Sequence, residues 1–282
     1  MNIIMFRMGK EKRRKLQAII LNMAVLTFLL LASCSPVYYG PSAPVLSGFE
    51  EKGDVSITAG AGYSDRIRSI EFFGREPNAP APDGGDTSLE GADLSVAFSP
   101  IDHLFLQYNL SYFYGDETNS NGSAERYSGN ALFQNVGIGW YNMMSENISW
   151  ENTLTFGRGR IDVDSRFNEE LDASLVKYGV QSGLFYKKKI MELGGILGLS
   201  KIKYDDIEGV LEFRGVDQVS YLKNNDEHLL LEPGFVFRIG HENIKFQVAA
   251  NTSFNLIESD FRQNNFNISF GAQFAFNAHN LK

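Results

Sequence analysis

The feature that most constrains this chain is a one-by-one alternation of apolar and polar residues over long segments. In residues 265–276 every second side chain is apolar, from Phe266 to Phe276, and the residues between them are polar or small. Residues 243–256 repeat the pattern. A period of two is what a β-strand with one apolar face requires. The alternation therefore predicts an all-β fold.

Ten such segments follow one another along the chain. Most have ten or more residues, against about five or six for a typical strand of a soluble protein. Tilted strands of roughly 9–11 residues cross the hydrocarbon core of a bilayer. The predicted strands are 54–63, 88–99, 103–114, 129–142, 147–160, 173–187, 190–203, 228–240, 243–256 and 265–276. Their length favours a membrane protein.

The connections between these segments alternate between long and short. The short connections are Pro100–Asp102, Met143–Glu146, Lys188–Lys189 and His241–Glu242. The longer ones are a Pro- and Gly-rich loop after residue 63, Gly115–Ser128, Ile161–Asp172, Tyr204–Glu227 and Ile257–Asn264. Outer-membrane barrels have short periplasmic turns, long outer loops and an even number of strands. We therefore predict a ten-stranded antiparallel up-and-down transmembrane β-barrel over residues 54–282.

The chemistry of the two faces predicts their orientation. A charge at the bilayer midplane costs roughly 2–4 kcal/mol, so the aromatic and aliphatic face should contact lipid. Tyrosine and tryptophan near the segment ends are expected in interfacial girdles, namely Tyr63, Tyr112, Tyr114, Trp140, Trp150 and Tyr186. The residues expected in the lumen are Asp93, Gln107, Asn109, Glu151, Lys177, Gln181, Glu232, Arg238, Lys245, Gln247 and Asn251. Both signs of charge occur among them, which predicts an internal network that fills a narrow barrel.

The N-terminal region has the order of an export signal. Residues 1–15 are basic, and residues 16–31 are almost wholly apolar. Leu31-Ala32-Ser33-Cys34 closes this stretch and resembles the lipobox of bacterial lipoproteins. The resemblance implies that residues 1–33 are removed and that Cys34 carries a covalent lipid, with residues 34–53 as an extended tether. An ordinary secretory signal or an uncleaved anchor helix is the alternative.

Composition limits the partners. Cys34 is the only cysteine, so neither an intramolecular disulfide nor a cysteine-built zinc site can form. Without residues 1–33 the chain has an excess of thirteen acidic over basic side chains, which would repel nucleic acid.

The last predicted strand carries a further motif. Ser269-x-Gly271-x-x-Phe274-x-Phe276 resembles the signal read by the barrel-assembly machinery, although six residues follow it. The expected partners are outer-membrane lipids, the lipoprotein-processing machinery and the barrel-assembly machinery.

The sequence contains few motifs that indicate catalysis or the binding of metals or phosphates. The sequence has no phosphate-binding glycine loop followed by a helix, no serine nucleophile elbow and no His-x-x-x-His zinc pattern. Acidic runs such as Asp162-Val163-Asp164 and Asp205-Asp206 are interpreted as solvated loops rather than calcium sites. We expect no metal and no cofactor other than the lipid.

One resemblance to an enzyme family remains. Asp226-Glu227-His228 lies at the outer rim, where the predicted loop 204–227 meets the strand 228–240, and Asp116-Glu117 lies in the second predicted outer loop. They are similar to the His-Asp and acidic pairs of the omptin proteases. The resemblance implies that Asp226 and His228 activate water opposite Asp116 and Glu117. The acidic pair of that family is Asp-x-Asp, from which Asp116-Glu117 departs.

The function expected from these features is that of a lipoprotein barrel of the Gram-negative cell envelope. Its long outer loops, with Phe72-Phe73 in the first, would serve a structural, binding or adhesion role. The alternatives are a barrel-rim enzyme, either an omptin-like protease or a lipid-modifying hydrolase, and a narrow pore. A tethered soluble lipocalin-like barrel would instead have an apolar interior and a polar exterior.

Overall fold

The computed structural model describes residues 42, 45–66, 87–118, 126–165, 167–213, 216–241, 243–257 and 265–278. Residues 1–33, Cys34 and Phe72-Phe73, which carry the predicted signal, lipid anchor and loop tip, lie outside the described residues. Within the described ranges, no helix is both long enough and apolar enough to span a membrane.

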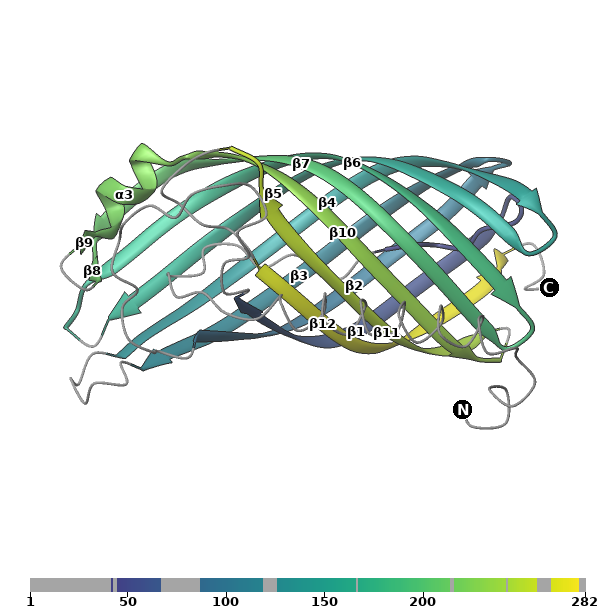
Figure 1. The fold of residues 1–282 in the computed structure, drawn as a ribbon, viewed down its shortest axis with the longest axis horizontal. Helices are drawn as coiled ribbons and strands as arrows, with labels where there is room; N and C mark the ends of the chain where they lie inside the picture. The colour runs from purple at the N-terminus through teal and green to yellow at the C-terminus, as the bar shows by residue number, and fades with distance from the viewer. Residues whose placement is uncertain are drawn as a thin grey trace, which may run out of the picture.

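Ten long strands form a closed antiparallel barrel, as predicted (Figure 1). Each strand pairs with its neighbours along the chain, and β12 pairs with β1 to close the barrel. The strands are β1 Asp54–Arg66, β2 Thr87–Ile101, β3 Leu104–Thr118, β4 Arg126–Ser145, β5 Ile148–Ser165, β6 Glu170–Lys188, β7 Met191–Val210, β10 Glu227–Gly240, β11 Ile244–Asn255 and β12 Asn265–Asn277.

The alternation of short and long connections is also confirmed. Turns at 102–103, 146–147 and 189–190, together with the ends of β10 at Gly240 and β11 at Ile244, share one end of the barrel, which we call the short-turn end. His103 and Lys189 have φ of 66° and 52°, the left-handed conformation that tight turns need. The strand ends that lead into the remaining connections lie at the opposite end, which we call the long-loop end.

Two predicted loops are wrong because strand pairing continues further outward than the alternation indicated. The predicted loop Ile161–Asp172 is largely strand, since β5 and β6 remain paired as far as Asp164 and Glu170. The predicted loop 204–227 contains the end of β7, a two-stranded sheet and a helix. These added elements are β8 Glu212–Phe213, β9 Val216–Asp217 and α3 Gln218–Asn224.

The orientation of the two faces is confirmed. Phe246 and Phe270 point outward with 72% and 60% of their surfaces exposed, among many exposed aliphatic side chains. Of the predicted lumen residues, Asp93, Gln181 and Glu232 are partly buried. The others are buried inside the barrel, namely Gln107, Asn109, Glu151, Lys177, Arg238, Lys245, Gln247 and Asn251. An apolar exterior around a polar lumen is the reverse of a soluble lipocalin-like barrel, so that alternative is wrong.

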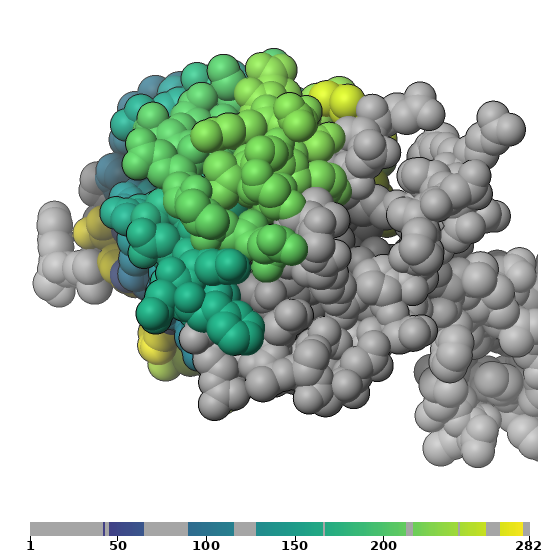
Figure 2. All heavy atoms as spheres, turned by 90° about the vertical axis from the view of Figure 1, so that its left-hand side faces the viewer, coloured from purple at the N-terminus to yellow at the C-terminus, as the bar shows by residue number. Residues whose placement is uncertain are grey.

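The prediction that the aromatic and aliphatic side chains face lipid is corrected at the long-loop end. There a buried apolar cluster, which we call the apolar cap, packs on the inner side of the strands. It comprises Phe133, Ile161, Leu171, Ala173, Leu175, Ile202, Tyr204, Ile207, Leu211, Val219, Leu222 and Leu230. Val219 and Leu222 come from α3, which packs against β7. Figure 2 shows α3 and its flanking residues covering part of this end. Strands that extend beyond the bilayer bury their apolar side chains inward, as soluble proteins do.

The barrel lumen as the candidate functional site

The short-turn half of the lumen is occupied by the chain itself. Residues 45–50, which we call the lumen segment, precede β1 and have no regular secondary structure. Glu50 pairs with Lys187 near the short-turn end at 2.8 Å, whereas the carbonyl of Ser42 accepts a hydrogen bond from Asn251 further inside at 2.9 Å. Followed backwards from β1, the chain therefore enters at the short-turn end and runs towards the middle of the barrel.

Glu151 binds the backbone of the lumen segment. Its two carboxylate oxygens accept hydrogen bonds from the amides of Ser47 at 3.0 Å and Gly48 at 2.6 Å. The Glu151 side chain is almost completely buried. Hydrogen bonds from amides to a carboxylate are stronger than neutral ones, and inside the barrel they are shielded from water.

The carbonyl groups of the segment are bound by side chains from three other strands. Arg238 of β10 donates to the Leu46 carbonyl at 2.6 Å, and Gln181 of β6 donates to the Val45 carbonyl at 2.8 Å. Gln273 of β12 donates to the Ser47 carbonyl at 3.4 Å. The wall of the barrel thus pairs with main-chain groups that would otherwise be buried without partners.

Two apolar side chains anchor the segment. Leu46 packs in a cluster with Phe185 and Val236, and Phe49 lies edge-on to Phe105 with ring centroids 5.7 Å apart. The wall is hollowed to receive Leu46, because a Cβ added at Gly194 would lie 2.4 Å from Cδ1 of Leu46. The segment and the wall therefore fit each other sterically.

A charged network surrounds this contact, as the sequence predicted. Glu192 accepts a hydrogen bond from Nζ of Lys245 at 2.5 Å and lies 3.6 Å from a guanidinium nitrogen of Arg238. Arg238 also donates to Gln247 at 2.7 Å. Pairing and hydrogen bonding offset the cost of burying these charges. The position of the lumen segment was not predicted, because its proline-rich surroundings have no periodicity.

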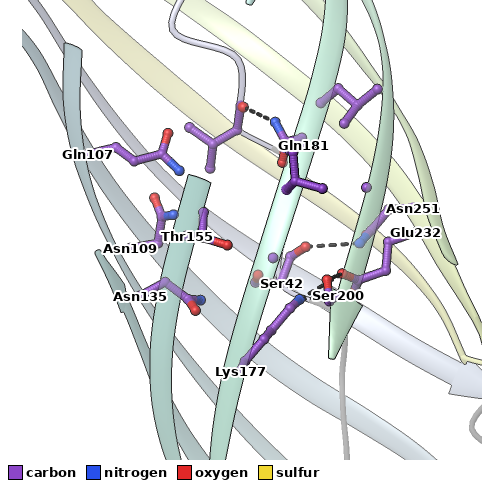
Figure 3. Close-up of a pocket in the computed structure, with 15 residues that line it drawn as sticks. Ser42, Gln107, Asn109, Asn135, Thr155, Lys177, Gln181, Ser200, Glu232 and Asn251 are labelled. Carbon is purple, nitrogen blue, oxygen red and sulfur yellow. Dashed lines mark hydrogen bonds and ion pairs between the residues drawn. The ribbon is translucent and has the colours of Figure 1, made fainter. Parts of the chain in front are cut away.

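Between the lumen segment and the apolar cap lies a polar cavity, which we call the chamber (Figure 3). Amide and hydroxyl side chains line it, together with Lys177 and Glu232, which form an ion pair at 2.8 Å. The predicted lumen residues Gln107, Asn109, Gln181 and Asn251 meet here. The alternation predicted their direction, but not the cavity that they share.

The structure places the omptin-like residues differently from the prediction. His228 lies in β10 and is completely buried, with Nδ1 3.1 Å from the side-chain amide of Asn255 and its ring against Tyr204. The backbone carbonyl of Asp226 accepts a hydrogen bond from the Tyr204 amide at 2.8 Å. His228, which was predicted at the outer rim, is therefore a buried strand residue.

Asp116 and Glu117 also belong to a strand rather than a loop. They lie in β3, where their backbones pair with Ser128 and Tyr127 of β4. Their side chains are outside the described part of the structure. In the circular strand order β3 and β10 lie on opposite sides of the barrel. Among the described residues, no group of three or more His, Cys, Asp or Glu side chains could hold a metal ion.

The fold and surface together define a class. A closed antiparallel barrel with an apolar outer surface, a polar lumen, short turns at one end and long loops at the other has the architecture of an outer-membrane β-barrel. The exposed Trp140 and Trp150 lie near the short-turn end, and Tyr63, Tyr112 and Tyr114 lie towards the other. Both positions are those of interfacial aromatic girdles.

Comparisons with known proteins find similarity of fold. No protein-family model matches the chain, and no curated protein sequence matches it. The transport unit of the autotransporter AIDA-I from Escherichia coli is 11% identical, with a TM-score of 0.45 over 82% of this chain and 93% of that one. An outer membrane channel from Pseudomonas putida F1 is 9% identical, with a TM-score of 0.43 over 82% and 97%.

The outer membrane protease OmpT from Escherichia coli is a further structural neighbour. It is 11% identical, with a TM-score of 0.37 over 79% of this chain and 95% of that one. The similarity to these three proteins is one of fold alone.

Proposed function

We propose that this chain is a lipid-anchored outer-membrane barrel that does not conduct solutes and that presents its outer loops for binding or adhesion. The main observation in support of a barrel that does not conduct solutes is that its lumen is occupied. The lumen segment fills the short-turn half with hydrogen bonds to both its amides and its carbonyls. The apolar cap adds a second obstruction at the long-loop end. This packing favours a rigid support over the narrow pore.

The extension of the strands supports a role outside the membrane. β4 and β7 each contain 20 residues, roughly twice the length that a tilted strand needs to cross hydrocarbon. At the long-loop end the extension continues into β8, β9 and α3. A rigid extension that displays irregular segments is the usual arrangement for loop-mediated recognition.

The membrane anchor rests on the lipobox resemblance of Leu31-Ala32-Ser33-Cys34. Acyl chains on Cys34 would strengthen attachment by about 0.8 kcal/mol per buried methylene. Metabolic labelling with a radioactive fatty acid should mark the full chain but not Cys34→Ala. Equal labelling of both would contradict lipidation at Cys34.

Conductance measurements test whether the lumen is closed. The full chain, reconstituted in planar bilayers with verified insertion, is expected to show no unitary current steps. A variant that combines Leu46→Ala and Phe49→Ala with replacement of residues 211–226 by a short turn loses both apolar anchors and part of the apolar cap, and is expected to show intermittent steps. Regular steps from the unaltered protein would refute the closed barrel and favour the narrow pore.

An adhesion assay tests the proposed role of the outer loops. Cells that display the chain should adhere to polystyrene and to one another more than cells that display a variant with residues 211–226 replaced by a short turn. Heat-modifiable gel migration would verify that the variant barrel is folded. Equal adherence of the two would remove this loop from the proposed role.

A further inference from the structure

The outer face of β5, β6 and β7, which lie side by side in the barrel wall, changes character in one order towards the long-loop end (Figure 1). Apolar side chains come first, then basic ones, then acidic ones. On β5 the outward side chains in this order are Leu154, Phe156, Arg158, Arg160, Asp162 and Asp164. On β7 they are Leu197, Leu199, Lys201, Lys203 and Asp205. The four basic side chains, which we call the basic layer, therefore adjoin the surface that faces hydrocarbon.

The basic layer lies close to the level of lipid headgroups. Tyr112 of the outer aromatic girdle pairs with Leu132 of β4, and Leu132 pairs in turn with Arg160. Aromatic girdles mark the boundary between hydrocarbon and headgroups. The long-loop end of an outer-membrane barrel faces the exterior. The basic layer is therefore placed to meet the headgroups of the outer leaflet.

This layer is a local patch and not a ring around the barrel. Among the described side chains of the strands, no other lysine or arginine lies on the outer face in the half of the barrel towards the long-loop end. On the opposite wall β2 has the exposed Glu90 near this end. The positive charge is thus concentrated over three neighbouring strands.

Two of the four basic side chains are held by carboxylates, and two are not. Arg160 lies 2.9 Å from Asp162 and 3.3 Å from Asp172, and Lys201 lies 2.7 Å from Glu227. The contact between Lys203 and Asp205 is longer, at 3.7 Å, and both side chains are about half exposed, so it contributes little. Among the described residues, no acidic side chain pairs with Arg158. Arg158 and Lys203 therefore leave close to two positive charges available to a ligand.

These two side chains flank a single residue. Arg158 of β5 and Lys203 of β7 are both register partners of Val176 on β6. Since neighbouring strands are about 4.8 Å apart, their Cα atoms are separated by about 10 Å. Both side chains are long enough to contact one group placed over Val176. A phosphomonoester carries a charge of about −1.5 to −2, which matches the two bases, and an arginine can bind two of its oxygens at once.

The surface next to the two bases suits an acyl chain. Phe156 and Tyr178 pair across β5 and β6 one step closer to the apolar band, with ring centroids 5.3 Å apart. Both rings are exposed on the outer face. A lipid whose phosphate lies over Val176 would therefore place the start of its hydrocarbon against these rings.

We propose that the basic layer binds an outer-leaflet lipid that carries a phosphomonoester headgroup. Arg158 and Lys203 bind the phosphate, and Phe156 and Tyr178 contact the first part of an acyl chain. Asp162 and Asp205, on the side away from the membrane, repel the phosphate and limit how far outward it can move. This site lies on the outer wall, so it depends neither on the closed lumen nor on what the outer loops bind.

Native mass spectrometry of the purified full chain, released from detergent micelles, tests the proposal. The protein is titrated with diphosphoryl lipid A and with phosphatidic acid, which are both phosphomonoesters. Dephosphorylated lipid A and phosphatidylglycerol, a phosphodiester with one negative charge, are the comparisons. Saturable retention of one molecule of each phosphomonoester lipid is expected, with weaker retention of both comparison lipids.

Variants separate this site from a general effect of charge. Arg158→Gln combined with Lys203→Gln should weaken retention of lipid A about thirtyfold, since each basic side chain near a membrane surface contributes a factor of about five. Lys188→Gln combined with Lys189→Gln removes the same charge at the short-turn end and should retain lipid A as the unaltered protein does. Heat-modifiable gel migration verifies that both variants are folded.

A third variant tests the site by a gain of affinity. Glu227→Gln frees Lys201 from its carboxylate and should tighten retention of lipid A about fivefold. If the Arg158 and Lys203 variant does not fold, this result decides, and unchanged retention in Glu227→Gln would then overturn the proposal.

Four other outcomes would also overturn it. They are the absence of saturable retention of both phosphomonoester lipids, retention of dephosphorylated lipid A as tight as that of lipid A, retention of phosphatidylglycerol as tight as that of phosphatidic acid, and an equal loss in the two double variants. The second would mean that acyl chains alone are bound, and the last that only the net charge of the protein matters.

Discussion

At the scale of single residues, steric fit between the wall and the lumen segment is the most specific feature of this barrel. Gly194 faces Leu46, whereas the adjacent Gly195 faces outward and a Cβ added there would meet nothing within 4 Å. One methyl group should therefore have very different effects at two neighbouring positions of β7.

Gly194→Ala is expected to lower the free energy of unfolding by about 1–3 kcal/mol, because overpacking forces Leu46 and Phe185 to move. Gly195→Ala should change it little. Urea unfolding in lipid vesicles, followed by tryptophan fluorescence, measures both. Leu46→Ala should remove much of the Gly194→Ala effect in the double variant, since the two residues share one space. Equal effects at 194 and 195 would contradict the fit.

Glu151 provides the second test at this scale. Glu151→Gln replaces a carboxylate that binds two amides with a group that has one acceptor oxygen, and should cost about 1–3 kcal/mol. Amide hydrogen exchange over residues 45–50 should accelerate in this variant, as detected by mass spectrometry. Glu146→Gln, at an exposed turn, is the control. Unchanged exchange in Glu151→Gln would show that the carboxylate does not hold the segment.

At the scale of elements, α3 depends on its first residues. Asp217 is the N-cap and accepts hydrogen bonds from the amides of Val219 at 3.0 Å and Ser220 at 3.2 Å. The Ser220 hydroxyl also donates to it, and these bonds lower the pKa of Asp217 from its ordinary value of 3.8. The charged form of the carboxyl is therefore preferred in the folded helix.

Because the folded pKa is depressed, this stabilisation is fully present above the ordinary pKa and is lost as the pH falls through the lowered value. The backbone amide signals of Val219 and Ser220 should consequently shift in strongly acidic solution. Asp217→Asn keeps an acceptor oxygen without titrating, and should show no such transition. A transition of the same size in Asp217→Asn would assign it to another group.

The elements also show what the sequence could and could not predict. All ten strands and the placing of short and long connections follow from alternation, because period two reports directly on a two-faced barrel wall. Strand ends were missed at 161–172 because both strands continue beyond the membrane, where an apolar face turns inward. The close contact between Gly157 and the Asn135 side chain could not be predicted, because it depends on the register of β4 against β5.

The candidate site was predictable only in part. The inward direction of Glu151, Arg238 and Asn251 followed from alternation, but their partners did not. Those partners are main-chain groups of the lumen segment and Ser42. Every residue has a main-chain carbonyl and almost every residue a main-chain amide, so the residue types do not indicate which of them is bound. The omptin-like interpretation placed His228 at the exposed outer rim, at the start of the predicted strand 228–240, but β7 continues beside it and its ring is buried against Tyr204.

At the scale of the whole molecule, the outer surface determines where the barrel can reside. Leu154 is 51% exposed and lies on β5 beyond the girdle residue Trp150, which places it in the apolar band. Leu154→Arg should lower the free energy of unfolding in lipid vesicles by about 2–4 kcal/mol, since the charge faces hydrocarbon. Glu146→Arg, at the short-turn end, should have little effect. Tolerance of Leu154→Arg would contradict the assigned lipid face.

The lumen segment has a consequence for the order of assembly. The barrel is closed by the pairing of β1 with β12, and the residues enclosed by that closure are the ones that immediately precede β1. A chain attached to the first strand of a narrow, side-chain-filled cylinder is placed most easily while the cylinder is still an open sheet. Assembly of this protein therefore couples the joining of its first and last strands to the enclosure of residues 45–50.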